Sequence, residues 1–329
     1  NDVNDVAVGA SQYSYLLDTN GDVIDDIMVY HTDVNRYLVV VNASNNDKDW
    51  TWLNAINVAG KYGVPQCTLR DLRNPSSGAD RRVDIALQGP ASVKTLVSLL
   101  DTEGHKHRLL QLPRTSIMRA SLAGMDVYIS RTGYTGESFG YEIFPHPEQV
   151  VALWDAILKA GQAFGVKPAG LASRDSTRTE AGLPLYGHEL AGPLNLGPAQ
   201  IGFAGYVKSF KPFFIGKTGY YAKAAQSSVK LSRFRMNEKG VRMPKLGDPV
   251  LDNRGRVIGT VTSCALDSDG FLLGMAVIDV AVGAKDGTQV FILAIPDRMP
   301  APLTQLAPLG SKAMVADAAT VLTRFPKKK

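Results

Sequence analysis

Two adjacent aspartates, Asp25 and Asp26, are the residues of this 329-residue chain whose type and setting most strongly indicate chemistry. They stand within the otherwise apolar stretch 23–30. Because side chains alternate along a strand, the two carboxylates point to opposite faces, and Asp26 shares its face with Met28 and Tyr30. Burying a carboxylate among apolar groups without partners is costly, so such an acid marks a functional site or a paired ion. The alternative is an acid at a hairpin end, wetted by solvent.

A tyrosine bracketed by glycines forms a second candidate. In the stretch Arg-Thr-Gly-Tyr-Thr-Gly at 131–136, the glycines permit a close backbone approach to a flat ligand on which Tyr134 could stack. The competing interpretation is a glycine hairpin with a packing tyrosine. Glu142, on the next predicted strand, alternates with apolar neighbours and is therefore expected on the opposite, solvated face. Arg174 and Asp175, further along the chain, are typical of a capped turn held by an ion pair.

Common catalytic signatures are absent from the sequence. There is no glycine-rich dinucleotide loop, no zinc-protease helix motif and no serine nucleophile elbow. Gly-Lys-Thr at 216–218 resembles the end of a phosphate loop, but Lys211 stands where such a loop needs glycine. His105 and His107 stand in a polar stretch that we interpret as a loop, with no third ligand near in sequence, so no metal is expected.

The composition, with 45% hydrophobic and 20% charged residues, is that of a globular chain with room for two or three domains. No apolar run approaches the ~18 residues of a membrane helix, so no membrane span is expected. A net charge of +5 is too small to indicate nucleic-acid binding. It fits a protein that binds an acidic protein partner as well as it fits a nucleic-acid-binding protein. Two cysteines without a paired motif indicate neither a zinc knuckle nor a disulfide scaffold, which favours a reducing compartment.

Two similar helices indicate an internal repeat. Trp-Leu-Asn-Ala-Ile-Asn-Val-Ala-Gly at 52–60 resembles Trp-Asp-Ala-Ile-Leu-Lys-Ala-Gly at 154–161, and each runs into a Gly-Val pair, as at a helix end that leads into a strand. Residues 83–167 predict a strand, a helix, a hairpin turning at 123–124, a strand, a helix and a final strand. This is the ferredoxin-like β-α-β-β-α-β arrangement.

The first unit, residues 1–82, shows only the later part of that arrangement. A hairpin over 12–30, a strand over 36–42, a helix over 47–59 and a strand near 64–69 are predicted, without an opening strand and helix. A unit without those elements has an uncovered sheet edge and an empty helix seat. About 30 residues are therefore expected before Asn1, judged from the length of the second unit.

The C-terminal part of the chain, residues 229–329, changes to short strands between turn signals, which predicts a small β-barrel. Residues 168–228, rich in glycine and proline, are interpreted as a linking segment that packs across both ferredoxin-like units. The predicted fold class is therefore α+β, with two ferredoxin-like units and a C-terminal barrel.

An ordered set of motifs along the chain resembles a known family. It comprises Val-Ile-Asp-Asp at 23–26, Val-Asn-Ala-Ser-Asn at 41–45, Gln-Gly-Pro at 88–90, Ser-Arg-Thr-Gly-Tyr-Thr-Gly-Glu at 130–137, Ser-Arg-Asp at 173–175, Glu-Ala-Gly-Leu-Pro-Leu-Tyr-Gly-His-Glu at 180–189, Phe-Ile-Gly-Lys at 214–217 and Gly-Thr-Val-Thr-Ser at 259–263. Over essentially the whole chain, the set resembles the aminomethyltransferase, or T protein, family of the glycine cleavage system. The resemblance implies that the three domains form a three-lobed ring with folate in its central hole.

The same resemblance implies a set of site residues. Asp26 matches the family's catalytic acid, and Tyr134 and Glu142 match residues that hold the pterin. The spacing before Glu142 is one residue longer than the family's. The full set that matches the tetrahydrofolate pocket is Tyr13, Asp26, Val40, Asn42, Tyr134, Glu142 and Arg174.

The implied activity is transfer of a one-carbon unit from the aminomethyl-lipoyl arm of H protein, an acidic carrier, to tetrahydrofolate, with release of ammonia. Glu142 would orient the pterin edge, and the charge of Asp26 would stabilise cationic character on the attacking nitrogen. Two alternatives stay open: a tetrahydrofolate-dependent demethylase of a small S-, O- or N-methyl compound, and a folate-binding protein without catalysis, which the presence of Asp26 disfavours. The implied location is the cytoplasm, or the mitochondrial matrix in a eukaryote, with no metal, membrane or nucleic-acid partner.

Overall fold

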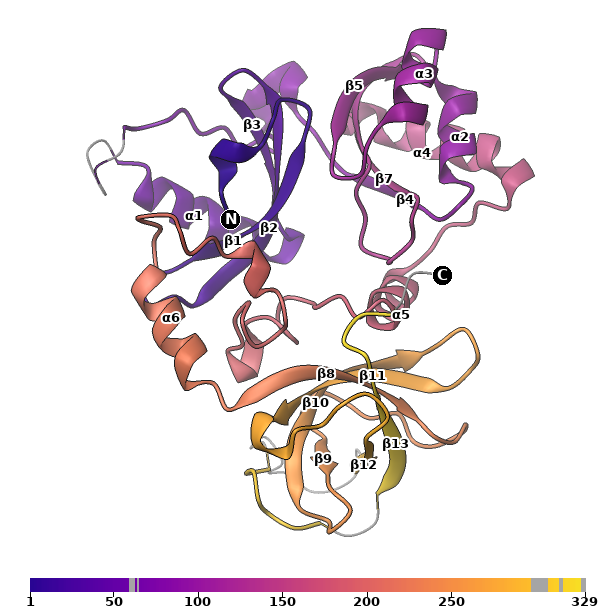
Figure 1. Ribbon diagram of the computed structural model, residues 1–329. Coiled ribbons are helices and arrows are strands. Elements are labelled where there is room, and N and C mark those ends of the chain that lie inside the picture. The colour runs from indigo at the N-terminus through magenta and orange to yellow at the C-terminus, as the bar shows by residue number, and fades with distance from the viewer. Residues whose placement is uncertain (59–62, 64, 297–306, 314–315, 327–329) are drawn as a thin grey trace. The chain divides into compact units, whose positions relative to one another are not determined.

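Figure 1 shows the computed structural model, which describes residues 1–58, 63, 65–296, 307–313 and 316–326. The chain divides into two compact units. The first comprises Asn1–Leu16 and Ile24–Ala169, and the second comprises Leu17–Val23 and Gly170–Lys329. The predicted α+β class, with ferredoxin-like sheets and a C-terminal barrel, is confirmed by the sheets described below.

The N-terminal sheet has three strands in the order β1–β2–β3. Its strands are β1 (Ser11–Leu17), β2 (Val23–Asp33) and β3 (Arg36–Val40), and helix α1 (Asn46–Ile56) follows. The hairpin, third strand and helix therefore form where the sequence predicts them. The predicted strand near 64–69 does not form, because residues 65–69 carry no strand and residue 64 lies outside the described residues.

A second, antiparallel sheet of the first unit has four strands in the order β4–β7–β6–β5. Its strands are β4 (Ile85–Gln88), β5 (Ile117–Leu122), β6 (Met125–Ser130) and β7 (Gly140–Phe144). Three helices belong to it: α2 (Ser92–Leu99), α3 (Glu103–Gln111) and α4 (Val150–Gly161). Fully buried Leu96 and Leu153 from the helices pack in one core with Ile129 and Ile143 from the strands.

The predicted strand after α4 is not part of this sheet. The backbone N–H of Val166 instead donates to the carbonyl of Gly161 (3.0 Å), and Gly165 adopts a left-handed φ of 75°. These residues cap the helix, so their backbone groups are already engaged. Strand β7, which precedes α4, is the fourth strand in its place. His105 and His107 also lie on α3 rather than in a loop.

The two sheets of the first unit meet at their edges. The N–H of Ser11 donates to the carbonyl of Thr115 (2.6 Å), and Ala10 forms a bridge with Ser116. Beside this junction the ring of Tyr30, from β2, packs edge-on against that of Phe144, from β7, with centroids 5.7 Å apart. A side chain at this end of β2 can therefore reach the second sheet.

The second unit contains a closed six-stranded barrel in the order β10–β11–β8–β13–β12–β9. Its strands are β8 (Val229–Met236), β9 (Pro249–Leu251), β10 (Val257–Leu266), β11 (Leu272–Asp279), β12 (Gln289–Ile292) and β13 (Asp317–Leu322). Buried Phe234, Val261 and Ile292 fill its interior. Glycine is required at 274 because a Cβ there would overlap the ring of Phe234.

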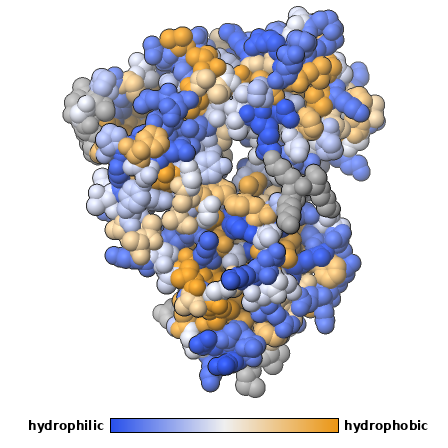
Figure 2. All heavy atoms as spheres, in the orientation of Figure 1, coloured by the Kyte–Doolittle hydropathy of each residue, from blue (hydrophilic) through white to orange (hydrophobic). Residues whose placement is uncertain are grey.

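Two helices precede the barrel in the second unit, α5 (Leu171–Glu180) and α6 (Lys217–Gln226). Among the described residues no helix has the length and hydropathy to cross a membrane. On the face shown in Figure 2, hydrophilic residues occupy much of the surface and apolar residues gather in separate patches.

Candidate active site

Asp26 lies on β2 with each carboxylate oxygen bonded to a donor from a neighbouring segment. The hydroxyl of Tyr13, on β1, donates to Oδ2 (2.7 Å), and Nδ2 of Asn42, just after β3, donates to Oδ1 (2.8 Å). Burial raises the pKa of Asp26, the hydrogen bonds from Tyr13 and Asn42 lower it, and the charge of Asp25 raises it. The strand pairs thus hold a half-buried carboxylate in one orientation.

Asp25 points to the opposite face of β2, as strand alternation predicts. This face carries the strand's buried residues Val23, Ile27 and Val29, so Asp25, and not Asp26, is the fully enclosed acid. Asp25 accepts hydrogen bonds from the backbone N–H of Asn42 (2.9 Å) and from its Nδ2 (2.8 Å). The amide of the buried Asn45, at 2.5 Å, is a third donor.

Val40 is the last residue of β3 and pairs in register with Met28 of β2. Its side chain is half-buried, and its strand is the neighbour of the strand that carries Asp26. Together with Tyr13 and Asn42, it belongs to the predicted site residues that the structure brings together around Asp26.

Glu142, on β7, is half-buried and hydrogen-bonded rather than solvated as predicted. Its Oε2 accepts from the hydroxyl of Tyr30 (2.8 Å) and from that of Thr132. Within the described part of the chain no donor contacts Oε1, so two of the carboxylate's four acceptor sites stay open. Burial and the charge of Glu142 raise the pKa of Tyr30, which keeps the tyrosine a donor.

Glu142 and Asp26 are linked through β2. Tyr30 and Asp26 stand four residues apart, on one face of the strand by alternation, which separates their backbones by about 13 Å. Because Glu142 is hydrogen-bonded to Tyr30, it lies near one end of this strand face, and Asp26 lies near the other. Two acceptors at opposite ends of one strand face suit an elongated ligand with donors or positive charge at both ends.

Tyr134 is half-buried in the loop between β6 and β7. Gln88 holds this loop, because its Nε2 donates to the carbonyl of Thr132 (3.4 Å) and its Oε1 accepts from the hydroxyl of Thr135 (3.3 Å). A Cβ at Gly133 would overlap the Gln88 side chain, so glycine there serves the close packing of this loop.

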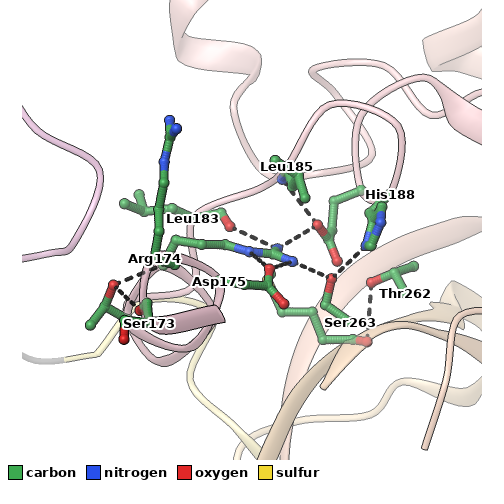
Figure 3. A network of polar contacts seen from close by, with 12 residues as sticks. Ser173, Arg174, Asp175, Leu183, Leu185, His188, Thr262 and Ser263 are labelled. Atoms are coloured by element: carbon green, nitrogen blue, oxygen red, sulfur yellow. Dashed lines mark hydrogen bonds and ion pairs between the residues drawn. The ribbon is translucent and has the colours of Figure 1, made fainter. Parts of the chain in front are cut away.

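Arg174, the remaining predicted residue, lies on α5 in the second unit and is exposed. Figure 3 shows its side chain pointing away from a polar network that contains Asp175. Asp175 pairs with Arg178, whose Nε lies 2.7 Å from Oδ1. The predicted turn is therefore helical, and its ion pair is made by Arg178.

Arg178 makes the central contacts of this polar network, and no motif in the sequence singled it out. Its buried guanidinium also contacts the buried carboxylate of Glu189 (2.8 Å) and the hydroxyl of Ser263 on β10 (2.7 Å). His188 lies 3.3 Å from the same hydroxyl. This network joins α5, the loop that follows it and the barrel, which is a structural task within the second unit.

Two other residues near Asp26 were not predicted. Asn45 belongs to the motif at 41–45 without a predicted role of its own, although its amide contacts Asp25. Asp49 stands in the first turn of α1, where an acid is ordinarily an exposed partner of the helix dipole, yet it is buried. Among the described residues no group of three metal-ligating side chains occurs.

Comparison with known proteins gives a consistent result. Residues 1–209 match the family model described as the GCVT N-terminal domain. An aminomethyltransferase of Caldanaerobacter subterraneus is 35% identical over 89% of this chain and 73% of its own length. Another, from Lysinibacillus sphaericus, is 38% identical over 85% of this chain and 71% of its own. The crystal structure of glycine cleavage system aminomethyltransferase T from Bartonella henselae superposes with a TM-score of 0.73 at 26% identity, covering 97% of this chain and 76% of that one.

Proposed function

The chain belongs to the aminomethyltransferase family of the glycine cleavage system, and from this premise we propose how its own residues carry out the transfer. The enzyme transfers a one-carbon unit. The acceptor is tetrahydrofolate, the donor is an aminomethyl group on the lipoyl arm of H protein, and ammonia is released. The relatives favour this activity over demethylation of a small methyl compound.

The residues of the first unit fit a reduced folate. A pterin presents parallel N–H donors along one edge, and the open Oε1 of Glu142 offers acceptor sites for them. Tyr134 offers an aromatic face nearby in the chain, and Val40 offers an apolar one beside Asp26. Tyr13 and Asn42 complete the binding set through Asp26, and Arg174 is assigned to it by motif alone.

The chemistry requires negative charge near a nitrogen that becomes cationic. Tetrahydrofolate, when bound, supplies the amine nitrogen that takes up the one-carbon unit. Asp26 is fixed by one donor on each oxygen, so its charge is oriented before reaction and needs no rearrangement during it. The observation that carries the proposal is this pre-oriented, half-buried carboxylate on the same strand face as the Tyr30–Glu142 pair.

Asp26→Asn tests this role, because the amide keeps the shape and removes the charge. We expect kcat to fall by about 10²-fold or more, with the KM for tetrahydrofolate little changed. Asp33→Asn, at the exposed end of the same strand, is the matched control and should behave as wild type. Glu142→Gln should instead raise the KM for tetrahydrofolate, because it exchanges an acceptor-only group for a partial donor. Wild-type turnover in Asp26→Asn would show that the electrostatic role is wrong.

The carrier partner is supported by an unusual charge distribution. Between positions 190 and 237 the sequence contains no aspartate or glutamate. The same stretch carries the lysines Lys208, Lys211, Lys217 and Lys230. Its other cations contribute less surface charge, because Lys223 and Arg235 pair with aspartates and Arg233 is buried. It also presents exposed aromatic rings, among them Phe210 and Phe213. Positive charge with exposed aromatics favours docking of an acidic protein.

Charge reversal tests the docking proposal. We expect Lys208→Glu combined with Lys211→Glu to raise the KM for aminomethylated H protein and to flatten its dependence on salt, while the KM for tetrahydrofolate stays the same. Lys94→Glu, on an exposed position of α2, is the control for net charge. An unchanged KM for the carrier would exclude this surface as the docking site.

The bacterial relatives also lead us to propose a cytoplasmic location.

A further inference from the structure

Asp49, on α1, has a fully buried side chain that the transfer reaction described above does not use. The residue is 1% exposed, and neither of its carboxyl oxygens has a hydrogen-bond donor among the described residues. An ionised carboxylate in such a place would lose its hydration without compensation. The environment of Asp49 therefore favours the neutral, protonated acid.

The group facing Asp49 is the carboxyl of Asp25. Two carboxyls can make a hydrogen bond only when one of them holds a proton. Asp25 already accepts three N–H donors from Asn42 and Asn45, which stabilise it as the anion. The proton of the pair consequently resides on Asp49, which donates to Asp25.

The charges around this pair act in the same direction. Burial, the hydrogen bond with Asp25 and the charges of Asp25 and Asp26 raise the pKa of Asp49, whereas Lys48 on the same helix lowers it, and the net result is a pKa of about 8. The other groups in the pair's network, Asn42 and Asn45, are neutral amides. Asp49 thus stays protonated at neutral pH and loses its proton in mildly alkaline solution.

Asn42 connects the pair to Asp26. Its Nδ2 donates to Oδ1 of Asp25 and to Oδ1 of Asp26, each at 2.8 Å, so one amide group bridges the two carboxylates with its two hydrogens. The orientation of that amide depends on Asp25, and the position of Asp25 depends on the donor behind it. The chain of contacts runs from α1 through β2 and the end of β3 to the carboxylate proposed to act in transfer.

We propose that Asp49 is a positioning residue, which donates its carboxyl proton to a hydrogen bond with Asp25 and, through Asn42, fixes the orientation of Asp26. The inference rests on the proposed function of Asp26. Loss of the Asp49 proton places a second charge against Asp25, which breaks this hydrogen bond and loosens Asn42. Turnover then declines at alkaline pH.

Two substitutions separate the roles of the proton and of the side chain. Asp49→Asn keeps a donor toward Asp25 and stays neutral at every pH, so its kcat at pH 7 should remain close to wild type and the alkaline decline near pH 8 should disappear. Asp49→Ala removes the donor and should lower kcat by about 10- to 100-fold through misplacement of Asp26. Asp47→Asn, an exposed acid of the same helix, should keep the wild-type pH profile.

An infrared measurement on the enzyme without substrate provides a readout independent of turnover. The difference spectrum between pH 6 and pH 9 should contain a protonated-carboxyl band in wild type and Asp47→Asn, and the band should be missing in Asp49→Asn. A band that persists in Asp49→Asn, an unchanged alkaline decline in that variant, or wild-type kcat in Asp49→Ala would overturn the proposal. Wild-type kcat in Asp26→Asn refutes the proposed function instead, whereas a slow Asp26→Asn beside a fast Asp49→Ala refutes the positioning role alone.

Discussion

Replacement of Arg178 by methionine should destabilise the second unit strongly. The Arg178 side chain is fully buried, and its partner Glu189 is 0% exposed, so the substitution leaves a carboxylate in the interior without its cation. Removing one partner of a buried ion pair costs about 3–5 kcal/mol. We expect this loss in the free energy of unfolding, which for a unit of about 170 residues lowers Tm by roughly 10 °C.

The individual contacts show why Glu189 dominates this loss. Asp175 is 42% exposed, so water replaces most of what Arg178 provides, and its share is no more than about 1 kcal/mol. In the part of the chain that the structure describes, the one donor that Glu189 retains on the oxygen contacted by Arg178 is the backbone N–H of Leu185, at 3.0 Å. Among the described residues its Oε1 has no donor at all. After the substitution Glu189 still interacts with the charge of Arg324 but has lost its hydrogen-bonded cation, and this weakly compensated charge is the largest cost.

The double substitution Arg178→Met with Glu189→Gln tests this assignment, because it removes both charges and should recover most of the lost stability. Urea unfolding followed by far-UV circular dichroism measures the effect. Tryptophan fluorescence serves as the comparison, since Trp50, Trp52 and Trp154 all lie in the first unit. A single variant within 1 kcal/mol of wild type, or a double variant no more stable than the single one, would refute the reasoning.

Two further predictions concern the acids of β2 and α1. Tyr13→Phe removes a hydrogen bond that lowers the pKa of Asp26, so the acid limb of the pH profile of kcat should move to higher pH. Tyr37→Phe, at an exposed position, should leave that limb in place. Coincident pH profiles of Tyr13→Phe and wild type would contradict this prediction. The pKa of Asp49 is about 8 in the folded protein and 3.8 in the unfolded chain, so the folded wild type binds an extra proton between about pH 4 and 8. As pH rises through that window, the free energy of unfolding of wild type therefore falls by up to ~1.4 kcal/mol per pH unit. Asp49→Asn lacks this loss and should gain stability relative to wild type. Urea midpoints at pH 5 and 8 measure the gain, and parallel pH dependence in the two proteins would exclude it.

The hairpin and its alternation could be predicted because they depend on local sequence. Side chains of a strand point alternately to its two faces, and the structure places Asp25 and Asp26 on opposite faces as predicted. The core side could not be predicted, because apolar residues occur on both faces of the strand. The outcome depends on packing by other elements, and it enclosed Asp25.

Non-local partners explain the remaining differences. Glu142 was expected in solvent because only its strand neighbours are visible in sequence, whereas its partner Tyr30 lies 112 residues away. The pairing of Asp175 with its neighbour Arg174 looked natural from adjacency, but on a helix the residue three positions on lies on the same face, and Arg178 occupies it. From the sequence, Asp49 is an ordinary acid of a helix N-terminus, and its contact with Asp25 arises only in the folded chain.

Two adjacent acids on one strand present an electrostatic problem whose solution explains the local design. Asp25 and Asp26 diverge by alternation, yet the charge of Asp25 still raises the pKa of Asp26. The structure offsets this with the amides of Asn42 and Asn45, whose N–H donors favour the ionised forms. Asp49 has no donor of its own among the described residues, so a third charge there would add to the repulsion, and the proposed neutral Asp49 avoids it. The buried acid thus allows the half-buried one to remain charged in a fixed position, which is what a transfer site for a cationic centre requires.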